Sequence, residues 1–406
     1  MRLKVTNARG RPALGITLLL ASLSMISPLS IDTFLPSFST IAAEFGLTAW
    51  EVQQIITAYL LPFALFSLVH GPLSDALGRR RVVIGGLVLY TVGCIGCFLA
   101  PTFATLLFCR VLQGLAAGIG PTVARAVVRD MFEGANAQRL MSSTMLVFSL
   151  APAAAPIIGG WVHVALGWRW VFGMLFVVGL MLALTCLLLF PETLPRRQRT
   201  PFHPLLLIRS CWRVGSGPAF FLLALAAGLG MASMFIYVGA APAIILDTWH
   251  LKETQFHYIF IPVVCGFVAA SFVGGRMAGR VPRSRQLLYG FGLLGATAAA
   301  GALLQTMLGP VPIPAVQVMW FLMALGTQIT FPVLSLQMLD MHPEARGAAA
   351  SVQSFVALSV GGIAMGMIAP VAHGDLRLLA WLSLAGALLA FLSWHTGSTL
   401  ARRRAV

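Results

Sequence analysis

Long, uninterrupted apolar segments alternate with short polar connections along the whole chain. Pro, Gly and charged residues separate the segments, and most approach or exceed the roughly 20 residues that a membrane-spanning helix needs. A transmembrane β-barrel would instead show short segments of alternating polarity. The pattern therefore predicts an all-α membrane protein with twelve spanning helices. We expect them near residues 13–37, 50–71, 82–100, 103–127, 139–162, 169–190, 218–246, 255–275, 286–308, 313–339, 347–371 and 376–397.

The amino-acid composition supports this interpretation. The 406 residues are 58% hydrophobic and only 10% charged. Soluble domains are about 45–50% apolar and about 25% charged. The chain is therefore predicted to be an integral membrane protein.

Lys and Arg residues are concentrated in alternate connections between the expected spans. Of the 27 Lys and Arg residues, 23 belong to the two chain ends and to alternate connections, whereas the opposite connections hold only Arg169, Lys252 and Arg377. This is the positive-inside pattern, and it places both termini in the cytoplasm. The first helix is then not expected to be a cleaved signal peptide. The net charge of +15 forms no basic patch interleaved with aromatic residues, so we expect no nucleic-acid partner.

The longest connection between the expected spans lies near the middle of the chain. It is rich in Pro and Arg, and we interpret residues 191–217 as a cytoplasmic linker. The linker would join an N-terminal six-helix half, residues 1–190, to a C-terminal six-helix half, residues 218–406. Tandem halves with a binding site between them, near the middle of the membrane, are an architecture of secondary transporters.

A short repeat supports duplication of the halves. The segment GPLSDALGRRR, which begins at Gly71, is followed 204 residues later by GRMAGRVPRSR. In this alignment Arg79 meets Arg283, whereas Asp75 meets Gly279. The repeat is recognisable, but the second copy has lost its acidic residue.

One carboxylate, Asp32, lies in the first expected span. A charge in the middle of a spanning helix costs about 2.5–3.5 kcal/mol on insertion scales, and such residues usually mark an ion or substrate path. Burial disfavours an ionised carboxylate, while a cationic partner or a bound drug favours it, so Asp32 is a candidate proton-coupling residue. The alternative is a helix that ends early and leaves Asp32 at the membrane interface. Asp247 and Asp340 fall at the ends of expected spans.

The fourth expected span contains RVLQGLAAGIG, which begins at Arg110. Arg110 is the only cation that we place inside the membrane, and it is the candidate charge partner of Asp32. Its side chain could alternatively extend to the outer interface. Gly114 and Gly118 are one turn apart and predict close approach of a neighbouring helix.

The fifth expected span contains SLAPAAAPIIGGW, residues 149–161. Two prolines and two glycines in one apolar helix indicate bends and close packing. These residues are Pro152, Pro156, Gly159 and Gly160.

Other reactive residue types give no sign of a catalytic or metal site. Cys94 and Cys97 form a CxxC pair, but no His or second Cys pair accompanies them, so packing is the preferred interpretation. We find no His-rich helix and no activated Ser or Cys. The sequence therefore predicts neither an enzyme nor a cofactor.

Several of these motifs resemble those of the major facilitator superfamily. GPLSDALGRRR resembles the GxLxDxxGRR loop between helices two and three, and RVLQG resembles the RxxQG motif of helix four. SLAPAAAPIIGG resembles the GxxxGPxxGG motif of drug antiporters, with Ala151 and Ala155 replacing the first two glycines. Together with DTFLP, ARAVVRDMF and PET, they resemble the bicyclomycin/chloramphenicol-resistance (Bcr/CflA) branch of drug:proton antiporters. The resemblance is strongest in the N-terminal half.

The resemblance implies roles for particular residues. Arg110, in a motif shared with Gln113, Gly114 and Gly118, is implied to take part in proton transfer. A conformational latch is implied for the loop between helices two and three, with two arginines of helix four as candidate partners for its acid. The latch set is Gly71, Asp75, Gly78, Arg79, Arg80, Arg125 and Arg129.

The expected function is proton-coupled export of drugs or other small amphipathic compounds by a monomer in a bacterial inner membrane. Adaptable or aromatic residues near the expected cavity are pocket candidates, with ordinary packing as the alternative for each. They are Tyr59, Met231, Met234, Phe235, Tyr237 and Gln328. Pro62, Phe66 and Ser67 depart from the branch's pattern in helix two, so substrate specificity does not carry over.

Two other functions stay open at this point. A narrow-specificity metabolite or amino-acid exporter would have the same fold. A non-transporting membrane receptor or a membrane enzyme would belong to another class, but that function leaves Asp32, Arg110 and the fifth helix unexplained.

Overall fold

The computed structural model describes residues 14–309, 311–372 and 374–403, and every regular element in these ranges is helical. The elements are α1 (Leu14–Asp32), η1 (Leu35–Ser37), α2 (Phe38–Phe45), α3 (Ala49–Leu77), α4 (Arg79–Phe98), α5 (Phe103–Ala117), α6 (Ile119–Met131), α7 (Gly134–Leu166), α8 (Trp168–Leu189), η2 (Arg196–Gln198), α9 (Pro204–Gly215), α10 (Pro218–Gly239), η3 (Ala243–Thr248), α11 (His257–Met277), α12 (Arg283–Met307), α13 (Ile313–Met341), η4 (Pro343–Ala345), α14 (Arg346–Ile363), η5 (Ala364–Ile368), η6 (Ala369–Ala372) and α15 (Leu376–Arg403).

Twelve helical segments of the described chain are long and apolar enough to cross a membrane, which confirms the predicted all-α fold. Some segments combine several elements: α1, η1 and α2 form the first, and α5 and α6 form the fourth. The helices run beyond several predicted limits. The first span reaches Phe45 rather than residue 37, and α4 begins at Arg79 because the arginine cluster forms its first turn.

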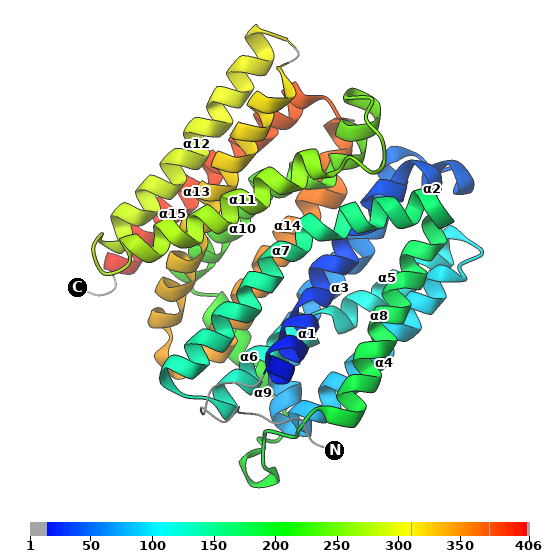
Figure 1. Cartoon of the computed structure of the whole chain (residues 1–406). Coiled ribbons are helices and arrows are strands. Elements are labelled where there is room, and N and C mark those ends of the chain that lie inside the picture. The colour runs from blue at the N-terminus through cyan, green and yellow to red at the C-terminus, as the bar shows by residue number, and fades with distance from the viewer. Residues whose placement is uncertain (1–13, 310, 373, 404–406) are drawn as a thin grey trace.

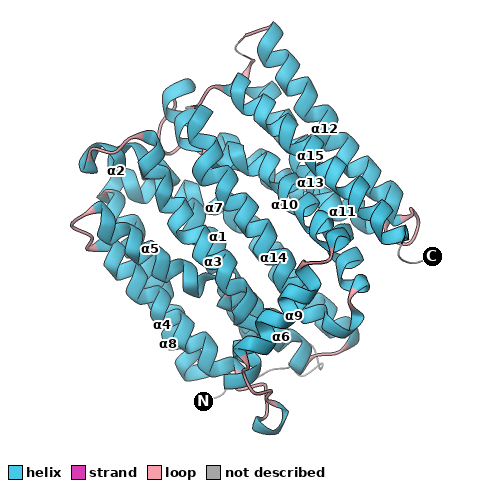
Figure 2. Ribbon diagram, turned by 180° about the vertical axis from the view of Figure 1, so that it is seen from behind, coloured by secondary structure: helices cyan, strands magenta, loops and turns pink. Residues whose placement is uncertain are grey.

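The spans gather in two groups that lie side by side (Figure 1). The elements α1 to α8 form one group, and α10 to α15 form the other. Between the groups, α3 packs against α14 and α7 packs against α11. The 12-residue helix α9 lies within the segment predicted to be a linker and packs on α14 (Figure 2).

The two ends of the helical assembly differ in charge. We call one the arginine-rich end; it carries the α3–α4 connection at Gly78, the segment 190–217 and the α11–α12 connection. The other is the arginine-poor end, with Arg169, Lys252 and Arg377. Because the number of described spans is even, α1 begins and α15 ends at the same end of the assembly.

Close contacts join the two groups at the arginine-poor end. The Gln53 side-chain amide donates to the Gly239 carbonyl at 2.7 Å, and Gln54 donates to the Gly366 carbonyl at 3.3 Å. A Cβ atom on Gly366 would collide with the Thr57 side chain, so glycine permits this approach. These contacts must separate before a path between the groups can open to that end.

Candidate functional site

Asp32 is the last residue of α1 and lies part-way along the first span. Beyond it the chain turns and forms η1, which contains Pro36; a proline lacks the N–H group and disfavours helix in the residue before it. The residue is only 5% exposed, and its carboxylate makes no ion pair or hydrogen bond with any described residue. The helix does end early, but the side chain is buried in the protein.

Arg110 is fully buried in α5, so its side chain does not extend to solvent. Its guanidinium carbon lies 4.4 Å from the ring centre of Phe34, 4.5 Å from that of Tyr59 and 5.9 Å from that of Phe172. Aromatic faces attract a cation at these distances, and the attraction is stronger when water is excluded. Three rings from three different spans therefore hold the positive charge.

Hydrogen bonds fix the orientation of the guanidinium. Nε donates to the Ile55 carbonyl at 3.2 Å, and Nη1 donates to the Ser30 carbonyl at 3.1 Å and to Gln113 Oε1 at 2.7 Å. Nη2 has no partner. The expected ion pair between Asp32 and Arg110 is not formed in this structure, because α1 presents the backbone of Ser30 to the arginine instead.

Further polar groups extend this network. The sequence pointed to Gln113 through its motif and to Cys94 only as a packing residue, and it did not single out Ser30 or Tyr90. Gln113 donates to Cys94 Sγ at 3.1 Å, and the Ser30 and Tyr90 hydroxyls are 2.6 Å apart. Ser and Tyr are common in apolar helices, so nothing in the local sequence singled these two out.

The glycines of the fourth span lie at close helix contacts. Gly114 faces the backbone of Tyr59 in α3, and a Cβ atom there would collide with it. Gly118 separates α5 from α6 and lies against the rings of Phe63 and His70. The fourth span is thus two helices with a junction at the glycine motif.

The glycine pair of α7 contacts both groups of spans. Pro152 and Pro156 lie inside this helix, and Gly159 lies against the carbonyl of Thr33, the residue that follows Asp32. Gly160 lies against the carbonyl of Glu253 in the second group, and neither position has room for a Cβ atom. Gly159 therefore lets α7 pack closely on the helix break after Asp32, and Gly160 lets it pack closely on the second group of spans.

A charge cluster at the arginine-rich end is centred on Arg79. Its guanidinium pairs with Asp75 at 2.5 Å and with Asp130 at 3.1 Å, and it donates to the Ser74 hydroxyl at 2.6 Å. Thr193 also donates to Asp130, at 2.9 Å. This cluster ties α3, α4 and α6 to the chain that follows α8.

Glu192 closes the cluster over Gly78. Its carboxylate accepts from the Arg79 backbone N–H at 3.0 Å and pairs with Arg199 at 3.1 Å. Gly78 has φ 98°, a left-handed value that favours glycine, and a side chain there would meet Glu192 and Arg199. PET and ARAVVRDMF contributed to the family resemblance, but the sequence did not predict that Glu192 and Asp130 within them contact the arginine cluster.

The two arginines expected to pair with Asp75 do not do so in this structure. Arg125 and Arg129 are exposed and make no ion pair among the described residues. Arg79 takes their place because it begins α4 only four residues after Asp75, across the turn at Gly78. Arg80 donates to the Leu187 carbonyl at 2.6 Å, and Gly71 has open space around it.

The six pocket candidates lie in different surroundings, although four of them belong to α10. Tyr59 stacks on Arg110, and Met234 and Tyr237 are buried in the second group, where the ring of Tyr237 lies 5.6 Å from that of Trp320. The remaining three are partly exposed, with Phe235 packed against Gly361 and Gln328 facing a hollow in the second group. They are Met231, Phe235 and Gln328.

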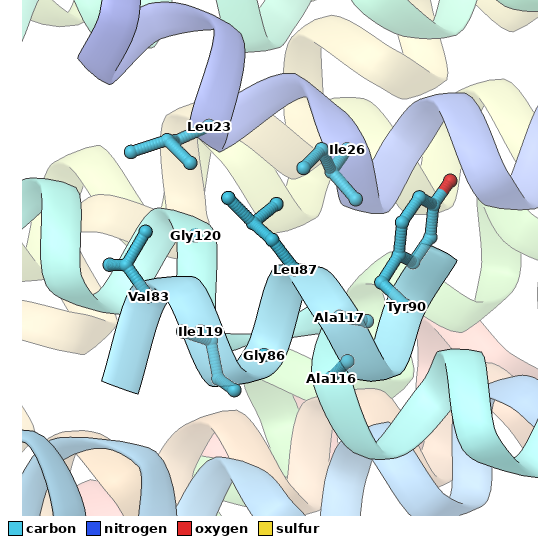
Figure 3. Close-up of a pocket in the computed structure, with 10 residues that line it drawn as sticks. All are labelled: Leu23, Ile26, Val83, Gly86, Leu87, Tyr90, Ala116, Ala117, Ile119 and Gly120. Carbon is cyan, nitrogen blue, oxygen red and sulfur yellow. The ribbon is translucent and has the colours of Figure 1, made fainter. Parts of the chain in front are cut away.

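A small void lies among α1, α4, α5 and α6, and Figure 3 shows its residues. Its volume is about 10 Å³ and its lining is almost wholly apolar, with Leu87 and Tyr90 of α4 facing Ile26 of α1. A cavity needs about 10–15 Å³ and polar partners to hold one water molecule. The void is a packing gap and not a substrate site.

The sequence profile of the Major Facilitator Superfamily matches residues 20–366. The chain belongs to this superfamily. As a member, it is a multi-pass membrane protein that transports small molecules and is not an enzyme.

Curated relatives of this superfamily member include drug-resistance proteins. An uncharacterised MFS-type transporter, YdgK of Bacillus subtilis, is 29% identical over 88% of this chain and 89% of its own length. A bicyclomycin resistance protein homologue of Haemophilus influenzae is 28% identical over 65% of this chain and 66% of its own. Others are named chloramphenicol or multidrug resistance proteins. The resemblance to the bicyclomycin/chloramphenicol-resistance branch is thereby confirmed.

Solved structures support the fold of this superfamily member. A bacterial homologue of the human lysosomal transporter Spinster, in an inward-facing and unoccupied conformation, has a TM-score of 0.69, with 16% identity and 96% of each chain covered. At that identity the likeness concerns the fold alone.

Proposed function

We propose that this transporter exports drugs or other small amphipathic compounds from the bacterial cytoplasm in exchange for protons. The names of its relatives support the substrate class. The bacterial inner membrane is the proposed location, with lipid, protons and the substrate as partners of a monomer.

The observation that carries the proton coupling is the state of Asp32. Its carboxylate is buried at a helix break, without an ion pair or hydrogen bond among the described residues. Burial without a partner favours the protonated carboxyl, and any cation that approaches favours the ionised form. A group in this situation can release its proton when its surroundings change.

The positive charge of Arg110 would favour the ionised form of Asp32, against the effect of burial. Arg110 is a fixed positive charge in the same group of spans, and its unpartnered Nη2 leaves it able to accept a new partner. Rearrangement of the break at residues 32–35 would change the separation of the two charges. A substrate near the ionised carboxylate and a proton on it would then exclude each other, because each favours a different conformation.

The transport cycle follows from the two groups of spans. We take residues 1–190 and 218–406 as halves that move against each other and residues 191–217 as their linker. The present contacts join the halves at the arginine-poor end, through Gln53, Gln54 and Gly160. If the arginine-rich end is cytoplasmic, this conformation is closed to the outside. Export then requires these contacts to separate.

The test of the coupling site is Asp32→Asn. The variant should insert and fold, since neutralising a buried carboxylate removes a desolvation cost. It should lose both drug-induced proton release from detergent-solubilised protein and proton-driven drug uptake into inverted vesicles. Asp247→Asn is the matched control, because Asp247 is exposed and forms no ion pair among the described residues. Proton release and drug accumulation that persist in Asp32→Asn would exclude Asp32 as the coupling site.

The orientation needs a separate test. Reporter fusions within the segment 196–213 should report the cytoplasm, and a fusion after Arg377 should report the opposite side. The expectation follows from the placement of 23 of the 27 basic residues. A periplasmic signal from the segment 196–213 would reverse the proposed direction of transport, whereas the coupling test at Asp32 would be unaffected.

A further inference from the structure

A hollow of about 780 Å³ opens in the second group of spans, at the arginine-rich end. It lies between α11 and α13 and reaches the connection into α12. Its volume falls within the roughly 300–1,000 Å³ of small-molecule sites. Neither Asp32 nor Arg110 lines it, so it is separate from the coupling site.

In the repeat, the residues of the second group that align with the Arg79 cluster border the hollow. The repeat aligns Arg79 with Arg283, and α4 and α12 begin at these two residues. However, α3 continues to Leu77 whereas α11 already ends at Met277, four residues earlier in the alignment. The second copy thus lacks the helical turn that carries Asp75 in the first.

The missing turn leaves the hollow with unbalanced positive charge. Gly279 stands where the first copy has Asp75, and the hollow contains two arginines. Arg283 pairs with Asp340 at 2.7 Å, whereas Arg280 makes no ion pair with any described residue. An anion bound in the hollow would pair with these arginines, as the Asp75 carboxylate pairs with Arg79 in the first group.

The rest of the wall is small and apolar. Ala270 and Gly274 of α11, with Ala278 just after its end, line the hollow on one side, and Pro332 and Leu336 of α13 line it on the other. A Cβ atom on Gly274 would meet nothing within 4 Å. The ligand must therefore combine an anionic group with an extended apolar part.

The surface around the hollow indicates where that ligand comes from. Phe272 of α11 is 64% exposed, and Leu288 and Tyr289 of α12 are 49% and 55% exposed. None of the three lines the hollow, but large apolar side chains exposed on spanning helices face lipid, so the helices around the hollow border the bilayer. Basic pockets between spanning helices on the cytoplasmic side are suited to acidic lipid headgroups.

We propose that the hollow binds an acidic phospholipid of the surrounding leaflet. Its phosphate lies between Arg280 and Arg283, and an acyl chain lies along the Gly274 face of α11 and the Pro332 face of α13. The bound lipid holds the end of α11 near the start of α12, as Asp75 holds α3 to Arg79 in the first group.

The test is native mass spectrometry of the detergent-purified full chain with phosphatidylglycerol, phosphatidylcholine or inorganic phosphate. Phosphatidylglycerol should bind, phosphatidylcholine should bind at least about fivefold more weakly, and phosphate alone should not be retained. Arg280→Gln should weaken phosphatidylglycerol binding by a similar factor. Arg276→Gln is the matched control, since Arg276 is exposed in the last turn of α11, four residues before Arg280, but does not line the hollow. Equal effects of the two substitutions, or equal binding of the two lipids, would overturn the proposal.

Two further variants test the shape and charge of the site. Gly274→Leu should fill the hollow and reduce binding of both lipids without loss of folding, because the space is open. Gly279→Asp should restore the missing acid and reduce phosphatidylglycerol binding; Gly279 has φ 73°, which Asp tolerates better than most residues. The thermal midpoint of each purified variant establishes that it is folded. Unchanged phosphatidylglycerol binding in folded Gly274→Leu would show that the lipid occupies another place.

Discussion

The arginine clusters at the ends of α3 and α11 come from the same repeat, yet they differ in packing. Arg79 pairs with two aspartates and its side chain is 8% exposed, whereas Arg283 pairs with Asp340 alone and its side chain is 55% exposed. In the first copy Glu192 and Arg199 cover the turn; in the second copy a hollow adjoins it. Both copies have the arginine. The α3–α4 connection is held in place by the acidic residues around its arginine, and the α11–α12 connection has fewer of them.

The difference predicts where the two groups of spans are rigid. A buried arginine with two carboxylates cannot lose either partner without leaving a charge uncompensated, whereas an exposed pair exchanges its partner for water at little cost. The α3–α4 connection should therefore move as one unit with α6 and α8. The α11–α12 connection should adjust more freely, and a ligand in the hollow can then control it.

The largest expected effect is that of replacing the central arginine. Arg79→Met should lower the free energy of unfolding by about 2–3 kcal/mol, because Asp130, whose side chain is 21% exposed, and Ser74 lose their hydrogen-bond donor, while Asp75 is 46% exposed and is rehydrated at little cost. Arg283→Met should cost less than about 1 kcal/mol. Unfolding of both variants in mixed detergent and sodium dodecyl sulfate measures the difference. If the two substitutions lower the free energy of unfolding equally, the exposed Arg283 pair stabilises the protein as much as the buried Arg79 cluster, and the comparison fails.

A second, smaller effect concerns the glycines of the two turns. Gly78 and Gly279 both have left-handed φ, 98° and 73°, so alanine should cost about 1–2 kcal/mol at either position from backbone strain. At Gly78 the new methyl group would also displace Glu192 and Arg199, whereas Gly279 has open space. Gly78→Ala should therefore lower the thermal midpoint more than Gly279→Ala. The opposite order would show that Glu192 moves aside freely.

Much of the fold could be predicted from the sequence because the bilayer imposes a simple rule. Apolar length fixes the spans, and twelve were found where twelve were expected. The limits of the helices were less predictable: Pro36 breaks the first span at Asp32, yet the helix resumes and continues to Phe45. No local signal distinguishes such a break from an end.

The candidate site was only partly predictable, for a different reason. Asp32 and Arg110 stood out because isolated charges are rare in apolar segments, and both are buried. Their partners are backbone carbonyls and aromatic rings, such as the Ser30 carbonyl and the ring of Phe34, which any apolar helix contains. Asp75 pairs with Arg79 and not with Arg125, and only the folded arrangement of the helices determines this choice. Spacing along the chain could not rank these partners.

The smallest expected effect is at Asp340, and it tests the comparison most directly. The Arg283–Asp340 pair has both side chains about half exposed, so Asp340→Asn should cost less than about 1 kcal/mol, and salt should screen even that contribution. Asp130→Asn should cost about 1–3 kcal/mol, since the Asp130 carboxylate is 21% exposed and accepts hydrogen bonds from both Arg79 and Thr193. Unfolding of both variants at low and high salt separates the two pairs. The cost at Asp340 should vanish at high salt while most of the cost at Asp130 persists, because partly buried pairs are screened less. A salt-resistant loss at Asp340 would mean that the second copy closes into a buried cluster like the first, and that its hollow is not a stable feature of the molecule.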